Sequence, residues 1–336
     1  MKKEIFKMNK NIFKIRFLLY VLLIYILNYQ NFFDYDLFIN RPGYVQYPVD
    51  DYEEKVSIEN RLLNFEKFNN ISGTNNYLVP NTIHYVNLNQ SQISFGQFLS
   101  ILSAWVNHRP SQILLHCNYC NYSGKYWEVL NKIPELKSRI KTRFTYHYKE
   151  KIFRNRLGWV QHKSDVLRLL VLMNFGGIYL DNDMIVINPL DKYRKFEIAV
   201  SWESDDHGIG NQIFIANKNA RFLRSIFDQY RDRYDPGCWY CNGGHEPQKI
   251  LIKHRYLVHQ NKLDLGTQML VGNLYYNKNW TEWKNMDAIH LLLNHRSYLD
   301  KDSPIKEFDE INLKNYTFTF GQIARDILQK AHVFDY

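Results

Sequence analysis

The segment GGIYLDNDMIVINPL, Gly176 to Leu190, places two carboxylates in the middle of an apolar run. Apolar runs of this length form buried strands, and a buried carboxylate is costly unless a positive group meets it. Along a single strand, alternation sends Tyr179, Asp181 and Asp183 to one side. We therefore expect both carboxylates to point into one space at the carboxyl end of a strand, where open α/β sheets bind ligands.

A divalent cation is the simplest partner for two neighbouring carboxylates. Mg²⁺ and Mn²⁺ bind carboxylate oxygens together with the phosphate oxygens of a substrate. A calcium loop of the EF-hand type is excluded, because Ile185 and Val186 stand where that loop needs a polar ligand and a glycine. The motif therefore predicts a metal site that receives a phosphate-bearing ligand.

The residues before the motif predict a buried helix. Ser164 is a suitable N-cap, and residues 165–174 are apolar on nearly every side. Asp165 and Arg168 are three residues apart and share one helix face. Gly176 and Gly177 would end the helix. An ion pair that supports a core helix would explain Asp165 and Arg168 without any ligand, and a functional role competes with that interpretation.

The chain upstream of this block has the pattern of a parallel α/β domain. Residues 82–88 are strand-like, residues 94–109 have a helical pattern that Pro110 ends, and QILLHCN follows as a second strand. Strand, helix and strand at this spacing form a βαβ unit. The chain contains no G-x-G-x-x-G or Walker sequence, which excludes the standard dinucleotide and P-loop sites.

The amino terminus predicts membrane targeting. The formal net charge is +9, and more than half of it lies in the first sixteen residues, directly before the apolar run FLLYVLLIYIL. The remainder is only mildly basic and does not indicate a nucleic-acid binder. No small-x-small cleavage site follows the run, so an uncleaved signal anchor is favoured over a cleaved signal peptide. We predict a basic cytosolic tail (1–16), a signal anchor (17–33), a stem (34–77) and a lumenal catalytic domain (78–336).

Cysteines and glycosylation signals agree with a lumenal location. The four cysteines form two C-x-x-C pairs, CNYC at Cys117 and CWYC at Cys238. The pairs are too far apart for a zinc ribbon, so disulfides are favoured, with three connectivities open. Five asparagines begin N-x-Ser/Thr triplets, which predicts a glycoprotein: Asn70, Asn89, Asn121, Asn279 and Asn315.

Taken together, one constellation resembles the signature of DXD-containing glycosyltransferase family 32, which includes yeast α-1,6-mannosyltransferase and animal α-1,4-galactosyl- and α-1,4-N-acetylglucosaminyltransferases. The resemblance implies a GT-A fold, a Rossmann-like mixed sheet flanked by helices. It also implies a retaining hexosyltransferase that uses a nucleotide-sugar donor and Mn²⁺ or Mg²⁺, and we favour a UDP-sugar. Together with the predicted signal anchor, this predicts a single-pass type II protein of the Golgi membrane. The matching residues are Asp165, Arg168, Gly176, Gly177, Tyr179, Asp181, Asp183 and Pro189.

By the same resemblance, Asp183 would ligate the metal directly, and Asp181 would reach the donor ribose or the metal through water. Asp165 and Arg168 would hold hydroxyls of the donor sugar, Tyr179 would line the donor site, and Gly176 and Gly177 would leave room for the sugar. Two residues downstream complete the predicted site: Asn211 at the donor or acceptor, and His290, with His295 in reserve, as a third metal or diphosphate contact.

Several alternatives stay open at this stage. A D-x-D phosphohydrolase would use Asp181 as nucleophile, although its apolar strand should end at the motif rather than continue. A catalytically inactive sugar-binding relative would bind glycans without turnover. The acceptor, a glycan, glycolipid or glycoprotein, is not specified, because Glu246 replaces a glycine of the family's acceptor-side loop. Retention requires a carboxylate nucleophile or front-face attack, and the sequence does not distinguish them. The aromatic residues considered for the acceptor are Trp202, Trp239 and Tyr240.

Overall fold

The computed structural model describes residues 70–145, 151–218, 220–266, 269–293, 296 and 305–334. The predicted cytosolic tail, the signal anchor and all of the stem before residue 70 lie outside the described residues, as does His295. Within the described part of the chain, no helix has the length and hydropathy needed to cross a membrane.

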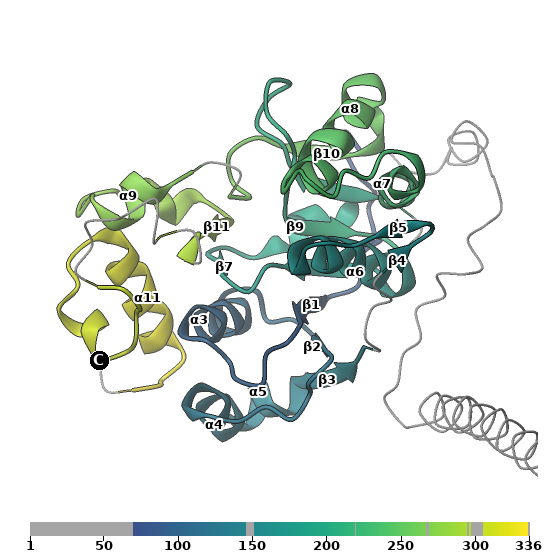
Figure 1. Ribbon diagram of the computed structural model, residues 1–336. Helices are drawn as coiled ribbons and strands as arrows, with labels where there is room; N and C mark the ends of the chain where they lie inside the picture. The colour runs from purple at the N-terminus through teal and green to yellow at the C-terminus, as the bar shows by residue number, and fades with distance from the viewer. Residues whose placement is uncertain are drawn as a thin grey trace, which may run out of the picture. The chain divides into compact units, whose positions relative to one another are not determined.

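A seven-stranded mixed sheet organises the described residues, in the order β10-β8-β9-β6-β1-β2-β3 (Figure 1). Every strand runs parallel to β1 except β9, which is antiparallel to both of its neighbours. The predicted mixed α/β architecture is confirmed. The strands are β1 (Thr82–Asn87), β2 (Gln112–Cys117), β3 (Ile140–Phe144), β6 (Gly177–Leu180), β8 (Ile198–Ser201), β9 (Gly210–Ala216) and β10 (His259–Asn261).

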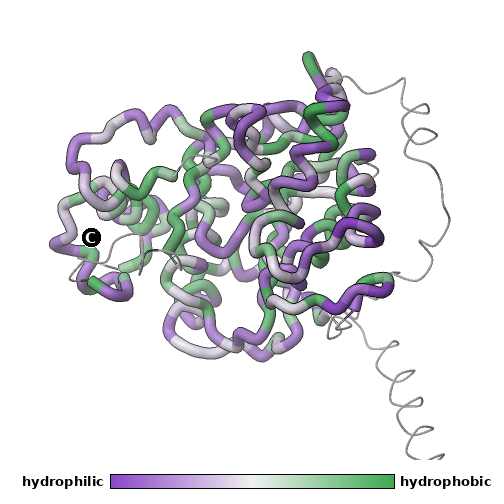
Figure 2. The backbone as a smooth tube through the Cα atoms, turned by 45° about the horizontal axis from the view of Figure 1, so that its top comes forward, coloured by the Kyte–Doolittle hydropathy of each residue, from purple (hydrophilic) through white to green (hydrophobic). Residues whose placement is uncertain are grey.

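Helices cover the sheet. Helix α6 packs on β1, on β6 and on α7, whereas α3 packs on α11 and on a short outer strand, β7 (Met184–Val186). The hydropathy of the chain alternates along the surface helices (Figure 2), because each buries one side only. The α-helices are α3 (Phe95–Ser103), α4 (Lys125–Lys132), α5 (Pro134–Arg139), α6 (Val160–Phe175), α7 (Arg221–Asp232), α8 (Glu246–Lys253), α9 (Val271–Tyr275) and α11 (Thr319–Lys330).

Strand order reverses at β1. The chain passes from β1 to β2 on one side of β1 and later returns to place β6 on the other side. Because parallel crossovers are right-handed, the connecting helices before β2 and before β6 fall on opposite faces of the sheet. Because these two connections leave the sheet toward opposite faces, a crevice forms beyond the carboxyl ends of β1 and β6. Asp181 is the first residue after β6 and stands at this crevice.

The apolar run around the two carboxylates is not one strand, and this prediction was wrong. Strand β6 ends at Leu180, Asp181 to Asp183 form a turn, and β7 (Met184–Val186) pairs with β11 (Ala288–His290) in a separate antiparallel sheet. The amide of Met184 donates to the carbonyl of Asp181 at 3.0 Å, which closes the turn and directs the chain away from the main sheet. The predicted location at the carboxyl end of a strand is correct.

Helix α6 begins earlier than predicted. It starts at Val160, with Trp159 in the N-cap position, so Ser164 lies inside the helix and does not cap it. The predicted end is correct, because Gly176 has φ +63° and Gly177 has φ +120°, a region that favours glycine. A Cβ on Gly177 would lie 2.6 Å from His84 Nε2 and 2.7 Å from the Thr82 carbonyl oxygen. The space beside Gly177 is therefore filled by β1.

The cysteines form two local disulfides, Cys117–Cys120 and Cys238–Cys241. The predicted disulfides are thus present, each within its own C-x-x-C motif.

The predicted glycosylation sites differ in exposure. Asn70 is 5% exposed, donates to Glu197 Oε2 and to the Tyr256 carbonyl, and accepts from the Glu197 amide. A glycan on Asn70 is incompatible with these contacts. The other four sequon asparagines are exposed.

Two fully buried histidines connect the parallel strands β1 and β2. His84 Nε2 lies 2.8 Å from the Gly176 carbonyl oxygen and therefore donates to it, so His84 Nδ1 accepts from His116 Nε2 at 3.0 Å. Burial lowers the pKa of His84 to about 4, even though the bond to Gly176 opposes the shift. Burial, together with the neighbouring His84, also lowers the pKa of His116 well below its usual value. Both rings are neutral in the folded protein.

Acid should destabilise the fold through this histidine pair. The unfolded chain protonates His84 near pH 6.5 and the folded chain near pH 4, so stability is lost as the pH falls through this window, by about 3 kcal/mol. Urea unfolding between pH 7 and pH 4 should show a shallower loss in the double variant His84→Leu/His116→Leu than in the wild type. The exposed His207→Gln variant is the control and should keep the wild-type slope. Equal slopes in all three proteins would contradict the assignment.

Candidate functional site

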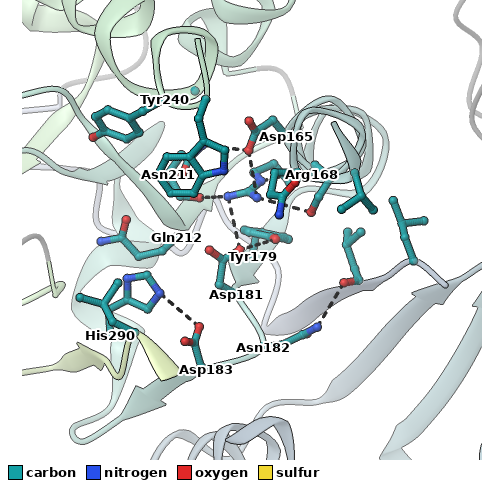
Figure 3. A pocket seen from close by; sticks show the side chains of 18 of the residues that line it. Asp165, Arg168, Tyr179, Asp181, Asn182, Asp183, Asn211, Gln212, Tyr240 and His290 are labelled. Atoms are coloured by element: carbon teal, nitrogen blue, oxygen red, sulfur yellow. Dashed lines mark hydrogen bonds and ion pairs between the residues drawn. The ribbon is translucent and has the colours of Figure 1, made fainter. Parts of the chain in front are cut away.

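A cavity of about 540 Å³ opens at the carboxyl ends of β1 and β6. Seven residues of the predicted site line it, although they come from α6, β6, the turn after β6, β9 and β11 (Figure 3). Gly176 and Gly177 do not line this cavity, so the predicted role of making room for a sugar is not supported. The seven are Asp165, Arg168, Tyr179, Asp181, Asp183, Asn211 and His290.

Arg168 is the centre of the polar contacts. Its Nη2 lies 3.0 Å from Asp165 Oδ1, and its Nη1 lies 3.3 Å from Asp181 Oδ1. Nη1 also donates to the Asn211 carbonyl oxygen at 2.5 Å, and the guanidinium carbon lies 4.6 Å from the centre of the Tyr179 ring. The residue is only 5% exposed. Arg168 is thus the positive group that meets one of the two carboxylates, Asp181.

Asp165 is held from two sides. Its Oδ1 accepts from Asn211 Nδ2 at 3.0 Å in addition to the contact with Arg168. Burial raises the pKa of the Asp165 carboxyl, and the opposing effects of Arg168 and Asn211 only partly offset it. A Cβ on Gly243 would lie 2.2 Å from Asn211 Nδ2 and 3.1 Å from Asp165 Oδ2. Any residue other than glycine at position 243 would therefore clash with this pair.

Asp181 has one oxygen engaged. Oδ1 accepts the Tyr179 hydroxyl at 2.6 Å and contacts Arg168. Among the described residues, none donates a hydrogen bond to Oδ2. The side chain is 26% exposed and lines the cavity. Asp181 therefore combines a structural contact behind it with an oxygen available to a ligand.

Asp183 has a different set of partners. The pairing of β7 with β11 sets His290 opposite Met184, and His290 Nε2 lies 3.1 Å from Asp183 Oδ1. The Leu293 amide donates to Asp183 Oδ2 at 3.0 Å. Burial alone would lower the pKa of His290, but the Asp183 carboxylate outweighs burial and raises it. Figure 3 shows His290 and Asp183 together, apart from the group around Arg168.

The donor set at this site fits a hard divalent cation in part. Among the described residues, only Asp235, Cys238 and Cys241 bring three potential ligand atoms within 4.8 Å of one another, and those two cysteines form a disulfide. Asp181, Asp183 and His290 therefore do not form a closed three-ligand site. Asp183 and His290 face each other and offer one oxygen and one nitrogen. Such a pair suits an ion that takes its remaining ligands from water and substrate, as Mg²⁺ and Mn²⁺ do.

Sequence reasoning missed several residues that line the cavity or border it, among them Gln212, Asn182, Gly243 and Gln97. Gln212, next to Asn211 on β9, is 7% exposed and donates to the Gly266 carbonyl at 2.8 Å. Asn182, the middle residue of the motif, accepts from Gln97 Nε2 at 3.2 Å. Two polar residues at the start of the apolar strand β9 were a usable signal. Asn182 gave a weaker one, and Gly243 and Gln97 gave none, because their roles depend on contacts between distant segments.

A known protein family matches the part of the chain that carries most of this site. Residues 78–199 fit the family model described as a glycosyltransferase sugar-binding region containing a DXD motif. The match includes Asp165, Arg168, Asp181 and Asp183 and ends before Asn211. It confirms the resemblance to DXD-containing glycosyltransferases and supports the prediction that this chain is a glycosyltransferase.

Two curated relatives are similar over part of their length. Glucan organizing enzyme 1 of Cryptococcus neoformans var. grubii is 28% identical over 194 residues, which cover 53% of this chain and 50% of that protein. An uncharacterized protein of Arabidopsis thaliana is 32% identical over 82 residues, 24% of this chain and 13% of that protein. The chain thus aligns with half of the first relative and with a smaller part of the second.

Solved structures of glycosyltransferases are distantly similar. The galactosyltransferase LgtC, in complex with donor and acceptor sugar analogs, is 11% identical, with a TM-score of 0.45 over 76% of this chain and 97% of that one. The PaToxG glycosyltransferase is 17% identical, with a TM-score of 0.36 over 74% of this chain and 86% of that one.

Removal of the Arg168 charge should destabilise the protein strongly. Arg168→Met leaves the buried Asp165 and the partly exposed Asp181 without their cation, which should lower the free energy of unfolding by about 3–5 kcal/mol at pH 7. The difference in unfolding free energy between this variant and the wild type should become smaller as the pH falls, because the unpaired carboxyls then take up protons. Urea unfolding at pH 7 and pH 5 measures both effects, and Asp165→Asn in the same background should restore part of the loss.

The matched control for this variant is Arg233→Met. Arg233 forms an ion pair with Glu246 at 3.7 Å but is 59% exposed, so its loss should cost about 0–1 kcal/mol. If Arg168→Met were no more destabilising than this control, the central role of Arg168 would be refuted.

Proposed function

We propose that this protein is a metal-dependent glycosyltransferase of the GT-A type. It would move a sugar from a nucleotide-sugar donor, a UDP-sugar being favoured, to a glycan, glycolipid or glycoprotein. The observation that carries the proposal is the turn at Asp181 to Asp183, which presents both carboxylates at one cavity, with His290 facing Asp183. The family match over the same turn supports it independently.

Asp183 and His290 would hold the cation. Their facing atoms, Oδ1 and Nε2, are 3.1 Å apart, so an ion would replace their present contact. When bound, Mn²⁺ or Mg²⁺ supplies the positive charge that stabilises a nucleoside diphosphate as leaving group. The amide of Leu293 donates to Asp183 Oδ2 and would keep this carboxylate oriented when its other oxygen binds the ion.

Asp181 and Asp165 would contact the donor rather than the ion. Asp181 lines the cavity, and its Oδ2, to which none of the described residues donates, would accept a hydrogen bond from a hydroxyl of the donor directly or through water. Asp165 is neighboured by Asn211 on the same wall. Arg168 forms ion pairs with both carboxylates and would fix their positions. Residues that contact a substrate need such support from neighbouring side chains to keep the reacting groups aligned.

Retention of anomeric configuration and residence in the Golgi membrane as a type II protein belong to this proposal. Retention rests on the resemblance to family 32, and the membrane topology rests on the basic residues that precede the apolar run of residues 17–27. The Tyr179 hydroxyl and Arg168 occupy Oδ1 of Asp181, and Asn211 and Arg168 occupy Oδ1 of Asp165. The second oxygen of each carboxylate would be the one that serves the sugar, either as a nucleophile or as a hydrogen-bond partner during front-face attack.

One observation favours a second candidate function, a D-x-D phosphohydrolase. The strand ends at Leu180, directly before the motif, as that class requires, so the continuing apolar run no longer argues against it. In that mechanism Asp181 would be the nucleophile. The family match favours the glycosyltransferase, and the two functions differ in which aspartate is essential.

The proposal predicts that Asp183→Asn loses metal-dependent turnover. Hydrolysis and transfer from UDP-Gal, UDP-GlcNAc, UDP-Glc and GDP-Man should fall at least about 100-fold, because the cation loses its carboxylate. Calorimetric titration with Mn²⁺ in the presence of UDP should show weakened binding. Asp206→Asn, an exposed carboxylate outside the cavity, is the control and should match the wild type.

The phosphohydrolase would give another pattern. It requires turnover of p-nitrophenyl phosphate that disappears in Asp181→Asn. A wild-type protein that cleaves this ester and no nucleotide sugar would overturn the proposed function.

A further inference from the structure

The cavity has two kinds of wall. Carboxylates and amides form the part around Asp181 and Asp183, whereas three well-exposed apolar side chains also line it. Val160 is 43% exposed, Trp239 is 46% exposed and Met269 is 66% exposed. Apolar surface joined to convergent polar groups suits a ligand that has an apolar face and polar edges.

The three aromatic residues considered for the acceptor differ in how much surface they present to a ligand. Trp202 is fully buried, so no ligand reaches its ring. Tyr240 lines the cavity but is only partly exposed, and its hydroxyl is engaged with the Ile209 carbonyl. Trp239 lines the cavity and keeps 46% of its surface exposed.

The C-W-Y-C loop, Cys238 to Cys241, holds Trp239 in place. The disulfide joins the two ends of the loop. The Tyr240 hydroxyl donates to the Ile209 carbonyl at 2.5 Å. A Cβ on Gly244 would lie 2.2 Å from Tyr240 Cζ, and one on Gly208 would lie 2.7 Å from Cε1, so the tyrosine ring lies directly against two glycine backbones. Tyr240 is thereby fixed, and its neighbour Trp239 with it.

The same loop is tied to the helix that carries Asp165 and Arg168. Trp159 Nε1, at the start of α6, donates to the Pro236 carbonyl at 2.8 Å. His162 Nδ1, on α6, lies 2.8 Å from the Tyr234 hydroxyl. The backbone at Gly243 lies so close to Asn211 and Asp165 that a Cβ there would clash with the Asn211 side chain. These contacts set the position of Trp239 relative to the polar wall of the cavity.

We propose that Trp239 is the platform on which the acceptor sugar stacks. A pyranose ring has C–H groups on its face and hydroxyls around its edge, which match an indole face beside carboxylates and amides. The acceptor assigned here is therefore a pyranoside, in a glycan or at the end of a glycoconjugate. This inference rests on the proposed function, because it concerns the second substrate of the same cavity.

The test separates donor use from acceptor use. Trp239→Ala is compared with the wild type in two assays: Mn²⁺-dependent hydrolysis of the preferred nucleotide sugar, and transfer to methyl glycosides of glucose, galactose, mannose and N-acetylglucosamine. The matched control is Tyr119→Ala, because Tyr119 lies in the other C-x-x-C loop, is 60% exposed and is outside the cavity lining.

We expect the acceptor KM of Trp239→Ala to rise about tenfold with little change in the donor KM, and Tyr119→Ala to match the wild type. Trp239→Phe should fall between, because it keeps an aromatic face. An unchanged acceptor KM in Trp239→Ala would refute the platform, and a matching rise in donor KM would assign Trp239 to the donor instead. The wild type could instead hydrolyse the donor without transferring to any glycoside or binding one in saturation-transfer NMR. That result would refute the pyranoside acceptor and leave the proposed function standing. Absence of donor hydrolysis in the wild type would count against the proposed function.

Discussion

The buried guanidinium of Arg168 is the interaction on which the site depends. Three carboxylates line the cavity, and two of them, Asp165 and Asp181, share this one cation at 3.0 and 3.3 Å. Without it their mutual repulsion and desolvation would oppose folding. The planar fork contacts both at once and stacks on Tyr179, which a lysine could not reproduce. One side chain on α6 thereby joins the helix to the turn after β6 and to β9 through Asn211.

The turn after β6 gives the two motif carboxylates different environments. Asp181 stays with the main sheet and with Arg168, whereas Asp183 leaves with β7 and meets His290 on β11. Asp181 thus keeps one oxygen to which none of the described residues donates, whereas both oxygens of Asp183 have a partner, in His290 and in the Leu293 amide. A third contribution comes from the C-W-Y-C loop, which adds an exposed indole to the same cavity. Polar and apolar walls come from segments far apart in the chain, which is typical of sites at a sheet switch point.

Much of this could be predicted from local pattern. The buried helix through Asp165 and Arg168, its end at Gly176 and the βαβ opening follow from periodicity and from glycine conformation. The start of α6 and the single strand through Asp183 were mispredicted. Trp159 caps without a side-chain bond, so Ser164 was a misleading signal. The break at Asp181 depends on pairing between β7 and β11, about a hundred residues apart, which no local window contains.

The sequence by itself determined which chemical groups are available. These are two carboxylates beside an apolar strand, the oppositely charged Asp165 and Arg168 on one helix face, and His290 in the last part of the chain. These follow from residue type and spacing, which act over a few residues. Only the tertiary structure decided which of these side chains contact one another. It paired Arg168 with Asp181 and His290 with Asp183, filled the space beside Gly177 with β1, buried Asn70 and Trp202, and left Trp239 at the cavity. Such choices depend on long-range packing, where each contact is set by the positions of elements that are distant in the chain.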